Sequence, residues 1–184
     1  MATHQKASIE IVNNWGGILL SVSVAHKYSD EYKNDHSWEN IMNGESTSST
    51  MVDFNTGWLT TGRDWWVVTW IDDKGDTYIT DPMNFRGVVD FLERIGSDIA
   101  EPVAAISAWV ATGSPEPTSK AIAAAVAVTS AVTKRFLNSE GTNGYKQHIL
   151  REEDKNGPTK IIIKKGEIEF QSNSGTSTTG FRKM

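Results

Sequence analysis

Residues 57–70 read GWLTTGRDWWVVTW and hold four of the seven tryptophans in the chain. Side chains alternate between the two faces of a β-strand, so Trp66, Val68 and Trp70 share one face. The other face carries Trp65, Val67, Thr69 and Ile71. Large apolar groups on both faces predict a central strand covered on both sides, or a strand with one face in the core and one presented to a ligand. For Trp66 and Trp70 we favour the core.

The segments around this strand also have the character of short strands. In GGILLSVSVAHKYSD, a period of two places Ile18, Leu20, Val22 and Val24 on one face, which His26 and Tyr28 continue. We expect further strands at 8–12, 35–39, 50–54 and 77–80, with a hairpin turn in IDDKGDTYI.

The pattern becomes helical after Asp81-Pro82. Apolar residues recur at intervals of three, four or seven at Val88, Leu92, Ile95, Ile99, Ile106 and Val110. Gly96 and Pro102 interrupt them, which is compatible with one kinked helix or with a second helix that begins near Asp98. The linker 112–119 and an alanine-rich helix at 120–137 follow.

The chain returns to β character after residue 138. GYKQHIL predicts a turn and a short strand, and TKIIIKKGEIEF predicts a hairpin around Lys165-Gly166. The last stretch, SNSGTSTTGFRKM, is small and polar, which predicts a poorly ordered or edge-lying tail. We therefore expect a mainly β, single-domain protein (1–184). Its antiparallel β-sandwich comprises 1–83 and 139–184, with a helical hairpin inserted at 84–138.

Composition excludes several classes of protein and site. The chain has no cysteine, so disulfides and thiolate chemistry are excluded, and its net charge of −5 argues against a nucleic-acid partner. Charge is uneven: residues 1–133 hold 8 Lys and Arg against 17 Asp and Glu, and residues 134–184 hold 10 against 6. No signal peptide or membrane-spanning run is visible, which predicts a cytoplasmic protein or one released without a signal peptide.

The sequence contains no arrangement typical of a catalytic or metal site. The four histidines lack the spacing of metal ligands, and no cofactor is expected. Asp53 and Asp64 flank the aromatic region and could serve a glycosidase, but no motif fixes two carboxylates across a sugar. No serine lies in a nucleophile elbow. We therefore predict a protein without enzymatic activity.

Several stretches together resemble a known family. IEIVNNWGG, VSVAHKYSD, HSWENI, NTGWLTTGRDWWVVTW and GYKQHIL, with the Asn-Ser-x-Gly-Thr-x-Gly stretch at 138–144, are similar to fungal proteins that carry the PUD domain. This family was first noted as upregulated in long-lived nematodes. The resemblance covers most of the chain and implies an aegerolysin-like β-sandwich. Aegerolysins bind membrane lipids, and related sandwiches bind sugars. The resemblance implies no catalytic residues.

Aromatic density beside polar loops predicts a soluble binding protein for a lipid headgroup or a glycan. The expected contacts are Trp15, Tyr28, Trp58, Arg63, Asp64 and Trp65. An alternative is a structural or storage-type protein that forms homo-oligomers through the helical hairpin. A carbohydrate-active enzyme is the third hypothesis.

Overall fold

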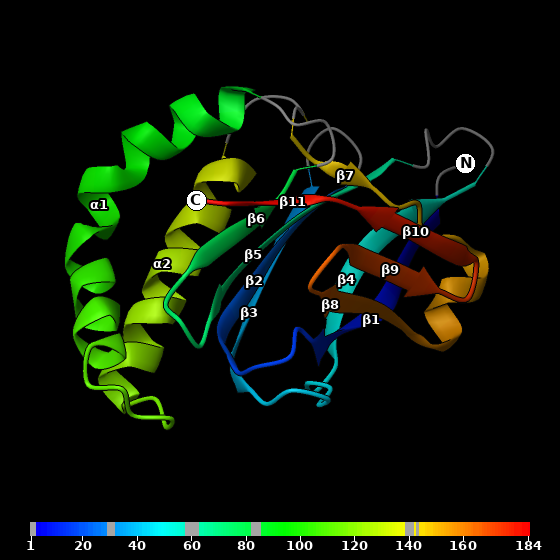
Figure 1. Cartoon of the computed structure of the whole chain (residues 1–184). Helices are drawn as coiled ribbons and strands as arrows, with labels where there is room; N and C mark the ends of the chain where they lie inside the picture. Colours follow the sequence, from blue (N-terminus) through cyan, green and yellow to red (C-terminus); the bar gives the residue numbers. More distant parts are fainter. Residues whose placement is uncertain (1–2, 29–31, 58–62, 82–85, 139–141, 143) are drawn as a thin grey trace.

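The computed structural model describes residues 3–28, 32–57, 63–81, 86–138, 142 and 144–184. Two β-sheets lie face to face, and two helices cover the outer face of one of them (Figure 1). The fold is therefore a mainly β sandwich with a helical hairpin, as the sequence predicts. The hairpin stands between β6 and β7 in the chain, and strands from both sides of it pair within both sheets.

The first sheet has five strands. Their order is β10 (Gly175–Thr179), β9 (Ile168–Ser172), β8 (Pro158–Lys164), β1 (Thr3–Asn14) and β4 (Thr50–Thr56). The neighbours β1 and β8 run parallel, whereas the other pairs of this sheet run antiparallel. The expectation of an antiparallel sandwich therefore needs one correction, because β8 returns to the centre of the sheet beside the first strand of the chain.

The second sheet carries the helices. Its order is β11 (Phe181–Lys183), β6 (Thr77–Thr80), β5 (Asp64–Asp72), β2 (Leu19–Tyr28) and β3 (Tyr32–Ile41). The short β7 (Lys146–Gln147) pairs with the start of β5, and a 3-10 helix follows at Glu152–Asn156. The tail predicted as poorly ordered or edge-lying forms β10 and β11, which are edge strands.

Strand β5 is covered on both faces. Trp66, Val68 and Trp70 lie in the core between the two sheets, and all three are fully buried. On the opposite face, Val67 and Ile71 pack beneath the helices. The interpretation of the tryptophan-rich stretch as a central strand covered on both sides is therefore correct for β5.

A β-bulge in β2 changes the predicted alternation. Leu19 pairs with Asp72 and Ser21 with Ile71, so β2 has one more residue than β5 at this point. Leu19 and Val22 consequently face the core between the sheets, while Leu20 packs against the helices. The prediction that Leu20 shares a face with Val22 is wrong, because a bulge reverses the alternation.

The two helices form an antiparallel hairpin. Helix α1 (Arg86–Val110) is continuous through Gly96 and Pro102, and α2 (Ser119–Leu137) lies between α1 and the second sheet (Figure 1). Thr118 caps α2 by accepting a hydrogen bond from the Ala121 N–H at 3.2 Å. Val110 is 38% exposed and the adjacent Trp109 is buried, so Trp109 replaces Val110 in the predicted apolar stripe. The side chains of Val88, Leu92 and Ile95 lie outside the described residues.

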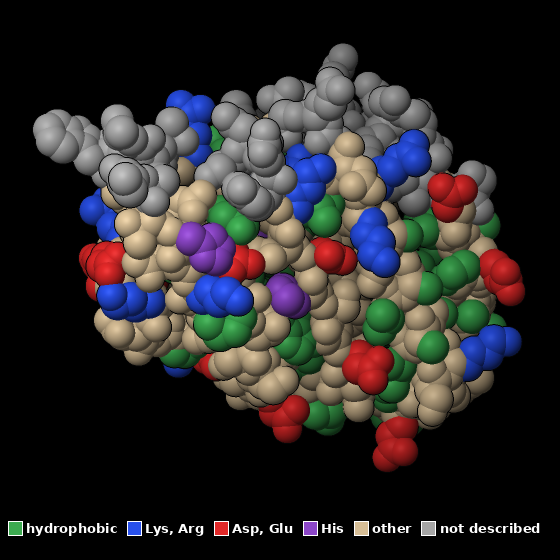
Figure 2. Space-filling model, turned by 180° about the vertical axis from the view of Figure 1, so that it is seen from behind, with side chains coloured by type: hydrophobic (Ala, Val, Ile, Leu, Met, Phe, Trp, Pro, Cys, Tyr) green, Lys and Arg blue, Asp and Glu red, His purple; other side chains and the backbone are tan. Residues whose placement is uncertain are grey.

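Side chains link the two sheets where β3 and β4 face each other. Asn34 accepts from the Asp53 N–H at 3.1 Å and donates to the Asp53 carboxylate at 3.3 Å. His36 bonds Thr50 at 3.3 Å, and Trp38 donates to the Ser48 carbonyl at 3.2 Å. The surface seen from behind carries acidic, basic and histidine side chains intermixed (Figure 2). Side-chain bonds thus occupy this edge of the sandwich.

Candidate functional site

The predicted ligand contacts lie at two different ends of the sandwich. Trp15 follows β1 and bonds Asp72 at the end of β5, whereas Tyr28 pairs with Asp64 at the start of β5. Eight steps of about 3.3 Å separate the ends of this strand by roughly 26 Å. Trp58 lies outside the described residues. The structure therefore does not bring these contacts together in one site.

Tyr28 and Asp64 are buried at the first end. The Asp64 carboxylate lies 3.0 Å from His26 Nε2 and accepts from the Leu150 N–H at 2.9 Å. The His26 ring stacks on Trp66 at 3.8 Å and on Tyr28 at 5.6 Å. Asp64 therefore holds the core together and is not exposed for a ligand, because its side chain is only 2% exposed.

Trp65 and Arg63 differ in exposure. Trp65 is half-buried and packs against the apolar cluster beneath the end of α2, while Arg63 is exposed. In the same region, the Lys27 ammonium lies 4.7 Å from the centre of the Tyr145 ring. Burial, followed by the charge of Lys33, lowers the pKa of Lys27. This end offers an exposed cation and one partly covered ring.

A pocket of about 360 Å³ lies at the opposite end, and we call it the Trp15 pocket. Three turns form it, and these connect β1 to β2, β5 to β6 and β8 to β9. The lining residues are Trp15, Gly16, Gly17, Asp72, Asp73, Lys74, Tyr78 and Lys165. The pocket thus combines aromatic rings with charges of both signs.

Asn13 and two glycines shape the first turn of the pocket. The buried Asn13 amide donates to the Gly17 carbonyl at 2.9 Å and accepts from the Trp15 N–H at 2.9 Å. A Cβ atom on Gly17 would lie 2.3 Å from the Asp73 carboxylate, and one on Gly16 would lie 2.9 Å from the Lys165 side chain. The glycines therefore leave the space that these two charged side chains occupy.

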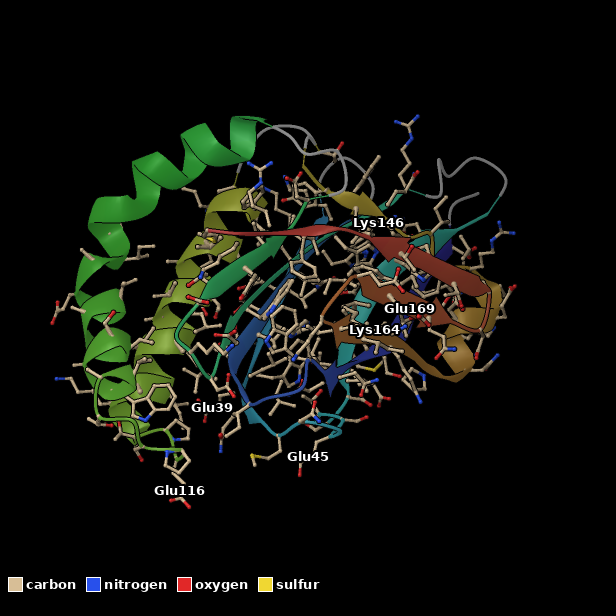
Figure 3. The ribbon with its side chains drawn as sticks, viewed as in Figure 1. Glu39, Glu45, Glu116, Lys146, Lys164 and Glu169 are labelled. Carbon is tan, nitrogen blue, oxygen red and sulfur yellow. The ribbon has the colours of Figure 1, made fainter. Side chains whose placement is uncertain are left out.

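The third turn is held by an ion pair on neighbouring strands. Lys164 of β8 and Glu169 of β9 form this pair, and Figure 3 shows both side chains on this hairpin. The Lys164 N–H also donates to the Glu167 carbonyl at 3.1 Å across the turn. These contacts position Lys165 at the tip of the hairpin, beside Gly16.

Asp72 joins the polar and aromatic parts of the pocket. One carboxylate oxygen accepts from the Trp15 indole at 3.3 Å and the Tyr78 hydroxyl at 3.4 Å. The other accepts from the N–H groups of Lys74 and Asp76, both at 3.0 Å. Burial raises the pKa of Asp72 against the opposing effect of these bonds. Burial and the charge of Asp72 raise the pKa of Tyr78 to about 12.

Four aromatic rings meet behind the pocket. Trp15 lies 4.9 Å from Tyr78, 5.4 Å from Phe181 and 5.8 Å from Trp70, measured between ring centres. Trp15 itself is only 8% exposed, so most of its ring belongs to the core. Edge-to-face contacts of this kind fix the rings in place. The wall that a ligand would meet is therefore rigid.

The family described as Up-Regulated in long-lived daf-2 matches residues 3–181. The chain belongs to this family. No curated protein matches the chain.

The match to the PUD family covers both sheets and the helical hairpin, so the hairpin lies within the region that the family describes. Within the described part of this PUD-family chain, no cluster of three or more His, Asp or Glu side chains could hold a metal ion. No described helix is long and apolar enough to cross a membrane. What the Trp15 pocket offers is hydrogen bonding, charge and an aromatic wall.

Most residues of this pocket are not predicted as ligand contacts by the sequence. Trp15 is predicted as a contact, whereas Asp73-Lys74-Gly75 and Lys165-Gly166 are predicted only as hairpin turns. The signal lay in the strand order, because the turns that follow β1, β5 and β8 meet at one end of the sandwich. With the parallel pairing of β1 and β8 and the antiparallel pairing of β2 and β5 assigned, the three turns would have been placed together.

Proposed function

We propose that this PUD-family protein is a non-enzymatic binding protein that holds a sugar ring or a lipid headgroup in the Trp15 pocket. The observation that carries the proposal is the meeting of Trp15 and Tyr78 with Asp73, Lys74 and Lys165 in a volume of about 360 Å³. Ligand pockets typically enclose about 300–1,000 Å³ and combine apolar walls with a few oriented polar groups. The Trp15 pocket falls within this range.

The chemistry of the lining favours a compact polar ligand with several hydrogen-bonding groups. A sugar ring presents hydroxyls to carboxylates and ammonium groups and a C–H face to an aromatic ring. A zwitterionic headgroup presents a phosphate to Lys74 or Lys165 and an amine to Asp73. Both ligands use the same three charged side chains, so variants at these positions test binding of either ligand in the pocket.

The binding test combines a glycan array with sedimentation of liposomes of phosphatidylcholine, phosphatidylethanolamine or phosphatidylserine. We expect the protein to bind at least one of these probes, and Lys165→Ala with Asp73→Asn to weaken binding by about tenfold or more. Lys155→Ala is the matched control, because Lys155 lies in the 3-10 helix near the start of β1, at the other end of the first sheet. Absence of binding to every probe would reject the proposal.

A second pair of variants tests the pocket through its shape. Gly17→Ala places a methyl group where the Asp73 carboxylate lies, so Asp73 must move and the pocket must change. Gly166→Ala is the control, because a Cβ there meets nothing within 4 Å. We expect Gly17→Ala to lose binding and Gly166→Ala to retain it. Equal binding by the two variants would mean that the ligand sits elsewhere.

An alternative function is assembly into homo-oligomers through the helical hairpin. A groove of about 540 Å³ separates α1 from α2 and is lined mainly by Pro102 and alanines, with Glu101 and Lys120 at its margins. On α1, Val103 and Val110 are 39% and 38% exposed. Exposed apolar groups on α1, together with a groove between the helices that carries both charge signs, are compatible with self-association.

Light scattering across a dilution series tests this alternative. A homo-oligomer would dissociate on dilution, and Val103→Glu with Val110→Glu would yield a monomer at all concentrations. Met51→Glu, at an exposed apolar position of β4 in the first sheet and away from the hairpin, is the control. A wild-type protein that stays monomeric at micromolar concentration would exclude assembly by this route.

A further inference from the structure

Strand β10 forms a free edge of the first sheet. In the hairpin between β8 and β9, the Lys164 N–H bonds the Glu167 carbonyl, which identifies this pair as hydrogen-bonded. Bonded and non-bonded pairs alternate along antiparallel strands. Backbone groups of Glu167, Glu169 and Gln171 therefore face β8, and those of Ile168, Phe170 and Ser172 face β10.

The same alternation fixes the direction of the β10 backbone. Gly175, Ser177 and Thr179 pair with the three β9 residues that face them. The N–H and C=O groups of Thr176 and Thr178 therefore point away from β9, to the open side. Within the described part of the chain, these four groups have no hydrogen-bond partner, and β10 ends the strand order.

Other sheet edges differ from β10 in their protection. The facing edges of β3 and β4 are joined by the side chains of Asn34, His36 and Trp38. Strand β11 carries Arg182 and Lys183, which are paired with Asp81 and Asp76. Charged residues and side-chain cover are the usual means by which proteins block edge pairing. Strand β10, with the sequence GTSTT, carries no charge and no proline.

A groove of about 230 Å³ runs beside this edge. One wall is the start of β10, and the other is the segment that follows β7. The lining residues are Gln147, His148, Ile149, Arg151, Ser174, Gly175, Thr176 and Ser177. Because both walls line the groove, a ligand must be narrow enough to lie between them.

Two buried polar side chains fasten the walls to each other. His148 bonds the Ser177 hydroxyl at 2.8 Å and the Ser172 hydroxyl at 3.2 Å. Asp154 accepts from the Ser174 N–H at 2.7 Å and from the Arg151 N–H at 2.6 Å. The groove is therefore fixed in shape before any ligand arrives, which reduces the entropy lost on binding.

The groove also has a charge preference. Arg151 is the charged side chain in its lining, it is exposed, and no described residue forms an ion pair with its guanidinium. Burial is the main cause that lowers the pKa of His148 beside the groove; the charge of Asp154 opposes it, and the charge of Lys146 on β7 adds to it. Exposed Ile149 adds an apolar contact.

We propose that the free edge of β10 binds an extended acidic peptide by strand addition. The backbone of Thr176 and Thr178 would supply main-chain hydrogen bonds, and Arg151 would pair with a Glu or Asp side chain of the peptide. In this mode of recognition the main chain gives affinity and the side-chain contacts give selectivity. The site lies away from the Trp15 pocket, and the proposal does not depend on the function proposed there.

The test uses a fluorescent heptapeptide, acetyl-Thr-Val-Thr-Glu-Thr-Val-Thr-amide, and fluorescence anisotropy with the whole chain. We expect it to bind more tightly than the same peptide with Lys in place of Glu. Thr178→Pro removes an outward N–H without removing a ladder bond, because proline is tolerated on sheet edges. It should weaken binding by roughly tenfold, while Thr178→Ala binds as the wild type.

Two further measurements keep the proposal testable if Thr178→Pro fails to fold. The Glu peptide methylated at every backbone nitrogen should not bind, because it keeps the side chains but loses the donors. Arg151→Glu should reverse the preference, so that the Lys peptide binds better. The proposal is overturned if the wild type binds neither peptide, if the methylated peptide binds equally, or if Arg151→Glu leaves the preference unchanged. It is also overturned if light scattering shows a second copy seated on β10, as a dimer that Thr178→Pro abolishes.

Discussion

Asp64 is a residue whose predicted role the structure reassigns. The sequence predicts it as a polar contact of a ligand, but both of its carboxylate oxygens are occupied inside the protein, by His26 and by the Leu150 N–H. Its main-chain carbonyl also accepts from the His148 N–H at 3.2 Å. Asp64 thus joins three segments that are far apart in the sequence.

We expect Asp64→Ala to lower the free energy of unfolding by roughly 3 kcal/mol, because it leaves a buried ring nitrogen and a buried N–H without an acceptor. Asp64→Asn keeps one acceptor and should cost less. Urea unfolding at pH 7 measures both, with the exposed Asp35→Ala as a control within about 0.5 kcal/mol of the wild type. Equal stability of Asp64→Ala and the wild type would contradict this role.

His148 makes stability depend on pH. Burial is the main cause that lowers the pKa of His148, opposed by the charge of Asp154. In the unfolded chain the imidazole takes up a proton as pH falls through about 6.5. The folded protein resists this uptake, so the unfolded state binds more protons and the free energy of unfolding falls as pH drops below about 6.5.

The measurement is urea unfolding between pH 7.5 and pH 5. His148→Gln should reduce the dependence on pH by up to about 1.4 kcal/mol per pH unit relative to the wild type, since one proton is involved. His4→Gln, at an exposed position of β1, is the matched control. If both variants keep the wild-type slope, His148 is not the group responsible.

At the scale of elements, the contact between α2 and the second sheet is partly polar. The Thr129 hydroxyl bonds Ser21 at 2.8 Å and Ser23 at 2.8 Å, and it donates to the Ala125 carbonyl at 3.1 Å. Ser37 and Ser130 continue this contact at 3.1 Å. Hydroxyl groups therefore fix the position of α2 on the sheet, between the apolar clusters at its two ends.

We expect Thr129→Val to destabilise the protein by about 1–2 kcal/mol, because the shape is kept while two buried serines lose a partner. Ala123→Ser, on the exposed side of α2, should be nearly neutral. Thermal unfolding followed by circular dichroism measures both variants. A stabilised Thr129→Val would show that the hydroxyl contacts do not hold the helix.

Much of this element arrangement could be predicted from the sequence. The alternation in DWWVVTW allows a strand covered on both faces as one of two interpretations, and the other sheet and the helical hairpin provide this cover for β5. The linker at 112–119 and both hairpins around Gly75 and Gly166 also agree with the structure. These features are local, so periodicity and turn residues are sufficient to reveal them.

The missing predictions depend on contacts between distant segments. Nothing in LLSVSVAHKY marks the bulge at Leu20, where β2 has one residue more than β5. The parallel pairing of β1 with β8 joins residues about 150 positions apart, and the Trp15 pocket depends on that pairing. Residues such as Lys165 become neighbours of Trp15 only when the topology is known.

For the whole molecule, the question raised by the tryptophans concerns their contact with solvent. Among the described residues, Trp15, Trp66, Trp70 and Trp109 are buried, and Trp38 and Trp65 are half-buried. The density of aromatic groups therefore serves mainly the core. A ligand at the Trp15 pocket would meet the exposed parts of Trp15 and Tyr78 rather than an open aromatic surface.

We expect iodide to quench only a small part of the tryptophan fluorescence once Trp58 is replaced. The anion does not enter the core, so the fluorescence of Trp58→Phe should be largely protected, and Trp65→Phe should remove part of the remaining quenching. Stern–Volmer plots in native buffer and in urea give the comparison. Strong quenching of native Trp58→Phe would mean that the described tryptophans are more accessible than their burial indicates.

The crossing of the chain at Gly180 has a consequence for synthesis on the ribosome. Residues 175–179 complete the first sheet and residues 181–183 complete the second, so one short segment closes both. Phe181 also supplies a ring behind the Trp15 pocket. Strands β1 to β6 leave the ribosome long before β8 to β11. The core between the sheets of the nascent chain is therefore incomplete until the last strands have emerged. Chaperones that shield apolar surface would therefore matter until residue 183 has emerged.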